Sequence, residues 1–437
     1  MNKVKYDVVI LGGGISGLVA AFKQQKSGKR VLLLEGSDRL GGVIQTVEKE
    51  GFRLEQGPNS ILANEEIQVL IKELGIENKV RKNEAIASIR YLLFKDKPLK
   101  MTPSWSLIRS GFLNLSIIWA FITEPFRKKG LSNDESIANF IRRRLNKDIL
   151  NQMINPLVTG VYAGDPEKLS LRSTFKKLYT MEQEHGSLIK AALNRNKKAP
   201  KREALSFEGG LNTLVASIGK KLEEVRVGTS ILQVSQSSEG YEITYQQSNI
   251  STKIQSEIVI STLPTTATTN VFEFLDTSLK QEIREVDYAP MLLVYLGYPK
   301  QNVQQELNGF GYLIPQQEKQ PYLGSIWSSA IFPEVAKEGH HLFTLFVGGV
   351  NNKGVIENQE ESIIKAKKAF EKHMGITGES SFQSHFLYKR AIPQFNLGYY
   401  KLMEKMNAVE QQYPGLYFSG NWRSGVAIGD CVAYNFK

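Results

Sequence analysis

The sequence predicts an α/β protein in which a parallel-sheet domain is joined to an α+β domain and to a helical insertion. Three observations predict this architecture. An apolar run at residues 7–11 ends in a glycine-rich turn. Residues 90–200 contain helical, basic and aromatic segments, and residues 289–349 contain several short apolar runs typical of antiparallel strands. We take these parts in chain order.

The first forty residues read as strand, tight turn, helix and second strand. Residues 7–11 are apolar, as in a parallel strand buried on both faces, and a helix is expected over residues 15–27. The turn between them has the spacing G-x-G-x-x-G, at Gly12, Gly14 and Gly17. The first glycine allows the turn, the second lets a pyrophosphate approach the backbone, and the third lets the helix pack on the strand. The pattern predicts a Rossmann-like dinucleotide site made by Gly12, Gly13, Gly14, Ile15, Ser16 and Gly17, with the helix N-terminus facing the phosphates.

The second strand supports the same prediction. Residues 31–34 are apolar and end in Glu35, which is placed to accept hydrogen bonds from a ribose 2′-hydroxyl. An acid at this position would repel a 2′-phosphate, which argues against NADP. The chain continues as Glu35-Gly36 and then Arg39, Gly41 and Gly42, an extension that folds specific for NAD do not usually carry.

Composition sets broad limits. The 437 residues are enough for two or three domains, and 41% hydrophobic with 23% charged residues is ordinary for a globular protein. A single cysteine excludes an internal disulfide and fits a reducing compartment. The net charge of +11 is dispersed, without zinc-finger spacing or an RNA-binding motif, so no nucleic-acid partner is expected. The first strand begins close to the first residue, so no secretory signal peptide is expected and the predicted location is cytoplasmic.

The helical insertion contains an uncharged stretch at residues 110–123, followed by Arg127, Lys128 and Lys129. Fourteen residues are too few to span a bilayer, which needs about 20. Two readings stay open. One is a buried core helix. The other is a helix in the membrane interface, with apolar contacts from Trp105, Phe112, Trp119 and Phe126 and basic residues near anionic head groups.

Three motifs resemble one enzyme family. Glu35-x-x-x-Arg39-x-Gly41-Gly42 is similar to the extended fingerprint of FAD enzymes of the amine oxidase and protoporphyrinogen oxidase superfamily. The segment N-P-L-V-T-G-V-Y-A-G-D-P at residues 155–166, followed by L-S-L-R-S at 169–173, resembles protoporphyrinogen oxidases in particular. So does G-V-A-I-G-D-C at residues 425–431, where the family turns a helix N-terminus toward the flavin pyrimidine edge. Only six residues follow Cys431, whereas relatives usually continue for several helical turns, and the sequence does not show how this affects FAD affinity.

The resemblance implies a fold and a domain plan. The fold is an FAD-binding Rossmann-like domain of the glutathione-reductase/p-hydroxybenzoate-hydroxylase type, with an α+β substrate domain and a helical membrane-associating insertion. The FAD-binding domain is expected to be discontinuous, over residues 1–85, 205–265 and 395–437. The helical membrane-associating and substrate-cap domain is expected at 90–200, and an antiparallel-sheet substrate-binding domain at 266–394.

The implied activity is FAD-dependent oxidation of protoporphyrinogen IX to protoporphyrin IX in heme biosynthesis. It proceeds in three two-electron steps with oxygen as acceptor, and hydrogen peroxide forms. Coproporphyrinogen III oxidation is the first alternative. A flavin amine oxidase and a catalytically impaired flavoprotein scaffold are further alternatives. Trp422 without a matching aromatic residue argues against an amine oxidase.

The resemblance also assigns site residues. FAD is expected to be non-covalent, because G-D-C at Cys431 matches the non-covalent family, and the flavin itself carries the chemistry, without a catalytic side chain or a metal. Arg90 is expected to hold a substrate propionate, a task suited to a guanidinium. The full substrate set is Arg90, Gly160, Phe310, Gly311, Leu313 and Phe346. Besides the turn, the expected FAD contacts are Glu35, Gly36, Arg39, Gly42, Val43, Gly57, Pro58, Asn59, Ser60, Ile231, Tyr400, Val426, Ala427 and Ile428.

The expected partners are the porphyrinogen and oxygen, with a peripheral membrane surface and hand-over to ferrochelatase as further candidates. The sequence does not distinguish the two porphyrinogens, because the charge of the pocket depends on which residues converge. Oligomeric state, the electron acceptor in the cell and attachment to the cytoplasmic membrane are not readable from it either.

Overall fold

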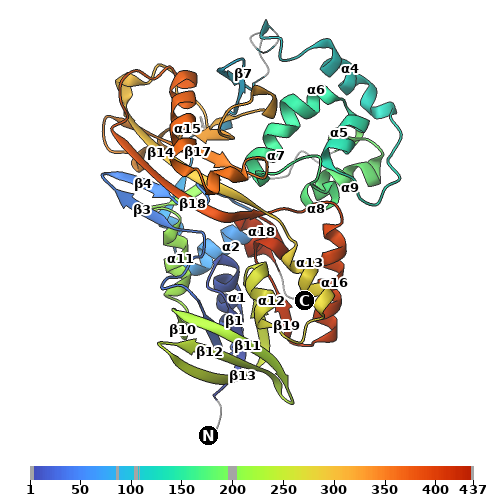
Figure 1. The fold of residues 1–437 in the computed structure, drawn as a ribbon, viewed down its shortest axis with the longest axis vertical. Coiled ribbons are helices and arrows are strands. Elements are labelled where there is room, and N and C mark those ends of the chain that lie inside the picture. The colour runs from blue at the N-terminus through green and yellow to red at the C-terminus, as the bar shows by residue number, and fades with distance from the viewer. Residues whose placement is uncertain (1–3, 85–87, 103–106, 108, 195–203, 435–437) are drawn as a thin grey trace.

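The computed structural model describes residues 4–84, 88–102, 107, 109–194 and 204–434. The chain forms an elongated molecule with two seven-stranded sheets, one toward each end of its long axis, and a group of helices beside the upper sheet (Figure 1). The N-terminal strand lies in the lower sheet, and the C-terminus returns to the middle of the molecule (Figure 1).

The lower sheet begins with parallel strands. β1 (Lys5–Leu11) lies between β2 (Val31–Leu34) and β13 (Ile250–Ser261), and β10 (Val225–Arg226) and β19 (Leu416–Phe418) extend it in parallel. All four residues of β2 are buried, as their continuous apolar run predicts. Helices α1 (Ile15–Lys26) and α11 (Asn212–Gly219) pack against this sheet and each other. The sheet therefore unites three stretches that are far apart in the sequence.

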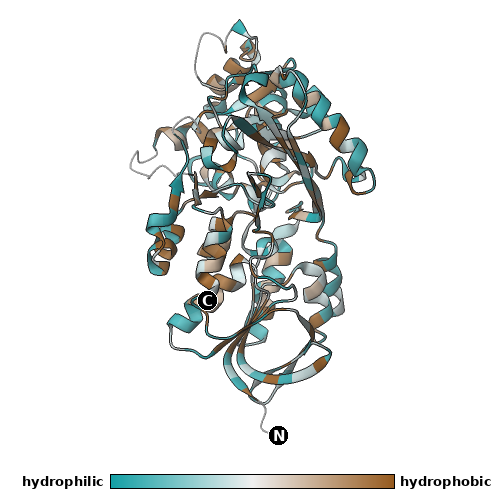
Figure 2. Cartoon of the chain, turned by 90° about the vertical axis from the view of Figure 1, so that its left-hand side faces the viewer, coloured by the Kyte–Doolittle hydropathy of each residue, from teal (hydrophilic) through white to brown (hydrophobic). Residues whose placement is uncertain are grey.

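The long strand β13 also carries an antiparallel ribbon with β12 (Gly240–Gln247) and β11 (Thr229–Ser237). Strands β11 and β12 are joined by a tight turn at residues 238–239. Gly228, with a φ of 64°, breaks the chain between β10 and β11. Buried and partly exposed residues alternate along β12, and Figure 2 shows hydrophobic and hydrophilic residues alternating in this ribbon near the N-terminus.

Several short elements connect the lower sheet to the rest of the molecule. The hairpin β3 (Thr46–Lys49) and β4 (Phe52–Glu55) leads to β5 (Ile61–Leu62) and helix α2 (Glu65–Leu74). β5 and β6 (Val80–Lys82) pair with β9 (Ala204–Phe207). Helices α17 (Asn421–Ser424) and α18 (Ile428–Ala433) end the described chain, and α18 packs on α1 and α2.

The upper sheet has the order β18-β14-β17-β16-β15-β7-β8. Its bounds are β14 (Tyr288–Pro299), β15 (Gly311–Leu313), β16 (Gly324–Ile326), β17 (His340–Gly348) and β18 (Phe382–Pro393). Strands β14 to β17 account for the apolar runs over residues 289–349 that were expected to form antiparallel strands, and helix α15 (Gln359–Met374) follows them in the chain. Strand β18 was not predicted. Most of its residues are exposed or partly exposed, so its sequence lacks the regular alternation of buried and exposed residues that indicates a strand.

The hairpin β7 (Tyr91–Phe94) and β8 (Lys97–Lys100) corrects one expectation. We expected residues 90–200 to be helical, but β7 pairs in parallel with β15 through Tyr312↔Tyr91, so residues 91–100 extend the upper sheet. Pairing with a strand more than 200 residues away has no local signal. The boundaries of the three expected domains stay a prediction.

The helices of the insertion lie beside the upper sheet (Figure 1). They are α4 (Leu115–Thr123), α5 (Ile137–Arg144), α6 (Lys147–Ile149), a π-helix (Leu150–Ile154), α7 (Asn155–Tyr162), α8 (Leu171–Thr174), α9 (Lys176–His185) and α10 (Leu188–Leu193). The remaining helices are α12 (Thr265–Val271), α13 (Thr277–Arg284), α14 (Ser328–Ile331) and α16 (Tyr399–Gln412).

A buried ion pair holds the insertion together. Glu124 and Arg144 are both fully buried and form a salt bridge. The Glu124 carboxylate also accepts hydrogen bonds from the Ser187 hydroxyl at 2.6 Å and from the Leu188 N–H at 2.9 Å. This charge-assisted network fixes the end of α4 onto α5 and the start of α10.

Among the described residues, no helix combines the length and the hydropathy needed to cross a membrane.

Candidate active site

The glycine-rich turn after β1 has two glycines that the fold itself requires. Gly12 has a φ of 101°, and a Cβ at Gly17 would lie 1.9 Å from the Gly12 carbonyl oxygen. Thr262, which follows β13, donates a hydrogen bond to the Gly12 carbonyl at 3.1 Å and closes the other side of the turn. No side chain fits at Gly17 while the turn keeps this shape.

Gly14 is different, because its surroundings are open. A Cβ at Gly14 would meet no heavy atom within 4 Å, and its φ of −69° and ψ of 176° suit any residue. Gly14 is the N-cap of α1, whose first turn has neither a side-chain cap nor an acidic residue. Open space in front of an uncapped helix N-terminus fits a phosphate, which the N–H groups and the helix dipole favour.

Glu35 lies beside this turn. One carboxylate oxygen accepts the Gly13 N–H at 2.5 Å, and the other accepts the Ser37 N–H and hydroxyl, both at 2.7 Å. A carboxylate has about four acceptor positions, so it retains capacity for a ribose hydroxyl. The Glu35 carbonyl accepts a hydrogen bond from the N–H of Thr229 in β11, the strand that carries Ile231. A Cβ at Gly36 would lie 3.7 Å from the Thr229 carbonyl oxygen.

Arg39 organises the second glycine pair. Its guanidinium donates to the carbonyls of Gly42 at 2.7 Å and of Ile44 at 3.3 Å. Gly41 donates its N–H to the Gly13 carbonyl at 2.8 Å, and Gly42, with a φ of 59°, would place a Cβ 3.2 Å from the Gly14 Cα. Residues 39–44 therefore form a second wall of the predicted pyrophosphate space.

Beyond this wall lies a cavity of about 650 Å³ between the two ends of the molecule. Ten of the predicted site residues line it, from both the cofactor set and the substrate set: Val43, Gly57, Pro58, Val426, Arg90, Gly160, Phe310, Gly311, Leu313 and Phe346. Gly57 is packed closely, because a Cβ there would lie 2.1 Å from the Val43 carbonyl oxygen. The structure thus brings the predicted flavin end and all six predicted substrate residues into one space.

The walls around the substrate residues are apolar. The Arg90 guanidinium lies over the Phe310 ring, 4.1 Å from its centroid, and burial lowers the Arg90 pKa. Gly160 of α7 faces Leu313 of β15, whose methyl carbon would be 2.6 Å from a Gly160 Cβ. Gly311 contributes backbone only, since its φ is 132° and a Cβ would lie 2.0 Å from the Ser325 carbonyl oxygen.

Other lining residues were not predicted. Met291 and Leu293 come from β14, Met153 from the π-helix, and Tyr388 from β18. Tyr388 donates a long hydrogen bond of 3.4 Å to the Val43 carbonyl, which joins the upper sheet to the predicted flavin loop. In the sequence these residues resemble ordinary core or surface positions, so no local signal distinguishes them.

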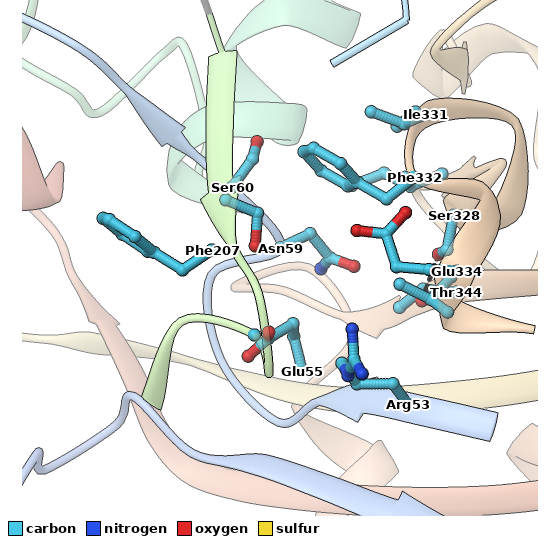
Figure 3. Close-up of a pocket in the computed structure, with 14 residues that line it drawn as sticks. Arg53, Glu55, Asn59, Ser60, Phe207, Ser328, Ile331, Phe332, Glu334 and Thr344 are labelled. Carbon is cyan, nitrogen blue, oxygen red and sulfur yellow. Dashed lines mark hydrogen bonds between the residues drawn. The ribbon is translucent and has the colours of Figure 1, made fainter. Parts of the chain in front are cut away.

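Asn59 and Ser60 line a second, smaller pocket of about 20 Å³, enough for one water molecule. Figure 3 shows Asn59 between Phe207 and Glu334, with Glu55 and Arg53 below it in this view. The Asn59 Nδ2 is buried and has no hydrogen-bond partner. Ile326 lines both pockets and separates them.

Glu55 is a buried carboxyl group that the sequence did not single out. It is 8% exposed, and burial raises its pKa to about 7, although hydrogen bonds from the Leu211 N–H and the Thr46 hydroxyl oppose the shift. It ties the loop before Gly57 to the start of α11.

The structure does not bring Tyr400 to the cavity. Its ring lies under the Arg172 guanidinium, 4.2 Å away, on α16. Ala427 and Ile428 begin α18, next to Val426 but outside the lining. Trp422 is also outside the lining, because it is buried and donates to the Leu263 carbonyl at 3.0 Å.

The chemistry of the donor set fits a dinucleotide with a flavin ring. Among the described residues that line the large cavity, there is no Asp, Glu, His, Cys or Lys side chain. Elsewhere in the described part of the chain, no group of three or more His, Cys, Asp and Glu residues could hold a metal ion. The lining residues can therefore position a substrate against the cofactor, exclude water from the cavity and supply one cation. These are the tasks that a redox cofactor leaves to its protein.

Comparison with known proteins gives consistent results. The family model described as "Flavin containing amine oxidoreductase" matches residues 15–433. The chain is 31% identical to protoporphyrinogen oxidase 1 of Arabidopsis thaliana, over 98% of this chain and 86% of the relative. It is 30% identical to coproporphyrinogen III oxidase of Bacillus subtilis (strain 168), over 99% and 97%.

Solved structures share the fold. A crystal structure from Exiguobacterium sp. 255-15, provisionally named a protoporphyrinogen oxidase, superposes with a TM-score of 0.81 at 24% identity, covering 99% of this chain and 97% of the other. Reduced UDP-galactopyranose mutase superposes with a TM-score of 0.74 at 16% identity, covering 98% and 93%.

Proposed function

The chain belongs to the flavin-containing amine oxidoreductase family and is an FAD-dependent oxidoreductase, and we propose that it oxidises a porphyrinogen to a porphyrin. The observation that carries the proposal is the single cavity that joins the predicted flavin loop, at Val43 and Gly57, to Arg90 and to apolar walls. The proposed main substrate is protoporphyrinogen IX, with coproporphyrinogen III as the alternative.

The shape and chemistry of the cavity suit this substrate class. A porphyrinogen is a large apolar disc with carboxylate tails. Gly160 of α7 and Leu313 of β15 lie against each other in one wall, and Met291 and Leu293 of β14 add further apolar lining, so apolar groups are available to contact a disc. The Arg90 guanidinium, stacked on Phe310, is placed to hold a propionate.

FAD would be held at the opposite end by this chain's own groups. The N-terminus of α1 and the open space at Gly14 would accept the pyrophosphate, and Glu35 a ribose hydroxyl. When bound, FAD would accept one hydride equivalent from the substrate in each of three rounds, while one proton is released to solvent, and reduced FAD would pass its electrons to oxygen with hydrogen peroxide as product. The walls keep water from the reacting carbon, and Gly57 and Pro58 bring backbone to the flavin end.

An amine oxidase is less well supported. A substrate amine is commonly held between aromatic rings, but Trp422 is buried with its indole N–H bound to the Leu263 carbonyl. Its ring is therefore not available to line the cavity.

The decisive test is porphyrin fluorescence after protoporphyrinogen IX is added to the purified, FAD-supplemented protein in aerobic buffer. We expect a rise well above autoxidation, together with peroxide. Arg90→Ala should raise KM while flavin content stays normal, because Arg90 lies at the substrate end. A flat trace from flavin-loaded protein with both porphyrinogens would contradict the proposal. Peroxide formed only with amines would favour the amine oxidase reading.

We also propose that α4 and its continuation contact a membrane surface peripherally. Trp119 is 65% exposed and Phe126 86% exposed, and Leu115 and Ile122 lie on the same outer surface with Arg127 to Lys129 close by. The buried Glu124–Arg144 pair holds this surface rigidly. Phe112 is fully buried, so its predicted lipid contact is wrong, and Trp105 lies outside the described residues.

The membrane proposal predicts co-sedimentation with vesicles that contain anionic phospholipid. A Trp119→Glu/Phe126→Glu variant should stay in the supernatant with unchanged FAD content, because both side chains point away from the core. Equal sedimentation of the variant and the wild type would contradict it. Oxygen as acceptor, a cytoplasmic location and hand-over to ferrochelatase complete the proposal, and each awaits its own experiment.

A further inference from the structure

The large cavity carries very little charge. Of the described residues that line it, Arg90 is the one with a charged side chain. The rest are aliphatic, aromatic, glycine, proline and a few neutral polar residues.

Neighbouring polar groups do not add charge to the lining. Lys100 pairs with Tyr91 across the β7–β8 hairpin, one residue before Met101, which lines the cavity. Lys100 itself is not among the described residues that line the cavity. The Tyr91 hydroxyl donates to Asn308, and the Tyr312 hydroxyl shares a 2.5 Å hydrogen bond with Tyr322.

The two candidate porphyrinogens differ in where they carry carboxylates. Protoporphyrinogen IX has two propionates, on adjacent rings, so both leave one edge of the disc. Coproporphyrinogen III has one propionate on each of its four rings. No rotation of that disc brings all four carboxylates to one edge, and at least two must leave from edges other than the one at Arg90.

From this distribution of charge we infer that the apolar lining is a specificity element, which accepts a porphyrinogen with carboxylates on one edge and discriminates against a tetracarboxylate. The inference rests on the proposed function and distinguishes its two candidate substrates. Sequence identity does not distinguish them, because the chain is 31% identical to a protoporphyrinogen oxidase and 30% identical to a coproporphyrinogen III oxidase. A carboxylate turned toward the buried lining residues Met291 or Leu293 would lose water without gaining a cation.

Leu157 is the position where this can be tested with least damage. It lies on α7, is 42% exposed and lines the cavity. Lysine has nearly the same helix propensity as leucine, so a cation can be introduced there without breaking the helix. Val161, one turn further along and 43% exposed, offers the same experiment from a second site.

The experiment compares kcat/KM for protoporphyrinogen IX and coproporphyrinogen III on the FAD-saturated enzyme, by porphyrin fluorescence in aerobic buffer. We expect the dicarboxylate to be preferred by at least about tenfold, since each unpaired carboxylate loses solvation. Leu157→Lys should raise kcat/KM for the tetracarboxylate by about tenfold, which is the effect of one charged hydrogen bond. Leu157→Gln, polar but uncharged, should keep the wild-type ratio. Val161→Lys replaces Leu157→Lys if flavin content shows that the latter is misfolded.

Equal or higher kcat/KM for coproporphyrinogen III in the wild-type enzyme would overturn the inference and leave the proposed function standing. An equal change with Leu157→Gln and Leu157→Lys would also overturn it, because charge would then not be the cause. If neither porphyrinogen is oxidised by flavin-loaded protein, the proposed function itself fails, and the inference with it.

Discussion

Replacing Gly14 by valine separates cofactor binding from folding of the turn. In the structure a Cβ at Gly14 meets nothing within 4 Å, and the backbone angles of this residue suit a β-branched side chain. Valine loses about 1 kcal/mol as an N-cap relative to glycine, but restricting the unfolded chain returns about 0.4–1 kcal/mol. The apoprotein should therefore keep nearly its wild-type stability.

The cost falls on FAD, because the side chain occupies the space in front of the α1 N-terminus. Losing two charge-assisted hydrogen bonds to the pyrophosphate, at about 1.5–3 kcal/mol each, amounts to about 3–6 kcal/mol. This raises the Kd for FAD by roughly 10² to 10⁴. Gly17→Ala is the contrasting variant. Its Cβ would lie 1.9 Å from the Gly12 carbonyl oxygen, so the apoprotein itself should lose stability.

The assay is thermal melting with and without FAD, together with flavin absorbance of the purified protein. FAD at about one hundred times its Kd stabilises the folded state by about 2.7 kcal/mol. With an unfolding entropy of about 2.1 cal/mol/K per residue over 437 residues, this raises the wild-type Tm by about 3 °C. Gly14→Val should melt like the wild-type apoprotein and show no shift. Full flavin absorbance in Gly14→Val, or an apoprotein that no longer folds, would refute the reasoning.

Three further predictions concern burial and packing. Burial raises the folded-state pKa of Glu55 to about 7 from 4.5, so the native state binds the proton more tightly than the unfolded state. The free energy of unfolding should therefore fall by about 3 kcal/mol as the pH rises from about 4.5 to 7. In thermal melting, Glu55→Gln should have a higher Tm than the wild type at pH 8 but not at pH 5. Arg144→Met should lower stability by about 3–5 kcal/mol in denaturant unfolding, because it leaves the buried Glu124 carboxylate without its cation. Adding Glu124→Gln should restore part of the loss, because the neutral side chain still accepts hydrogen bonds from Ser187 and Leu188. Gly160→Ala should retain FAD but raise the porphyrinogen KM several-fold in steady-state kinetics, because its Cβ displaces the Leu313 methyl into the cavity, and an unchanged KM would mean that substrate does not pass this point.

The sequence could predict the turn because its residues are contiguous. The strand at residues 7–11, the glycines at 12, 14 and 17 and the acid at 35 all interact within one β-α-β unit, where spacing determines contact. The open space at Gly14 and the closed space at Gly17 agree with the roles that the fingerprint assigns to them.

The cavity could be predicted only through the family resemblance. From composition and periodicity alone, Arg90 would be interpreted as an ordinary surface residue at a strand edge. Its position over Phe310 follows from the parallel pairing of β7 with β15, which joins residues more than 200 positions apart. Tyr400 shows the limit of the resemblance, since one guanidinium, that of Arg172, covers its ring away from the cavity.

By itself the sequence determined the nucleotide-binding turn and the helices and strands with clear periodicity, because local backbone preferences and short spacings encode them. The choice of FAD as cofactor came from the family resemblance. Only the tertiary structure decided which side chains share the cavity, that Arg90 is its charged lining residue among those described, and that Glu55 and Asn59 enclose a separate small pocket. The physical reason is that burial and charge at a point depend on every segment that packs there. Those segments meet only after strands distant in the chain have paired.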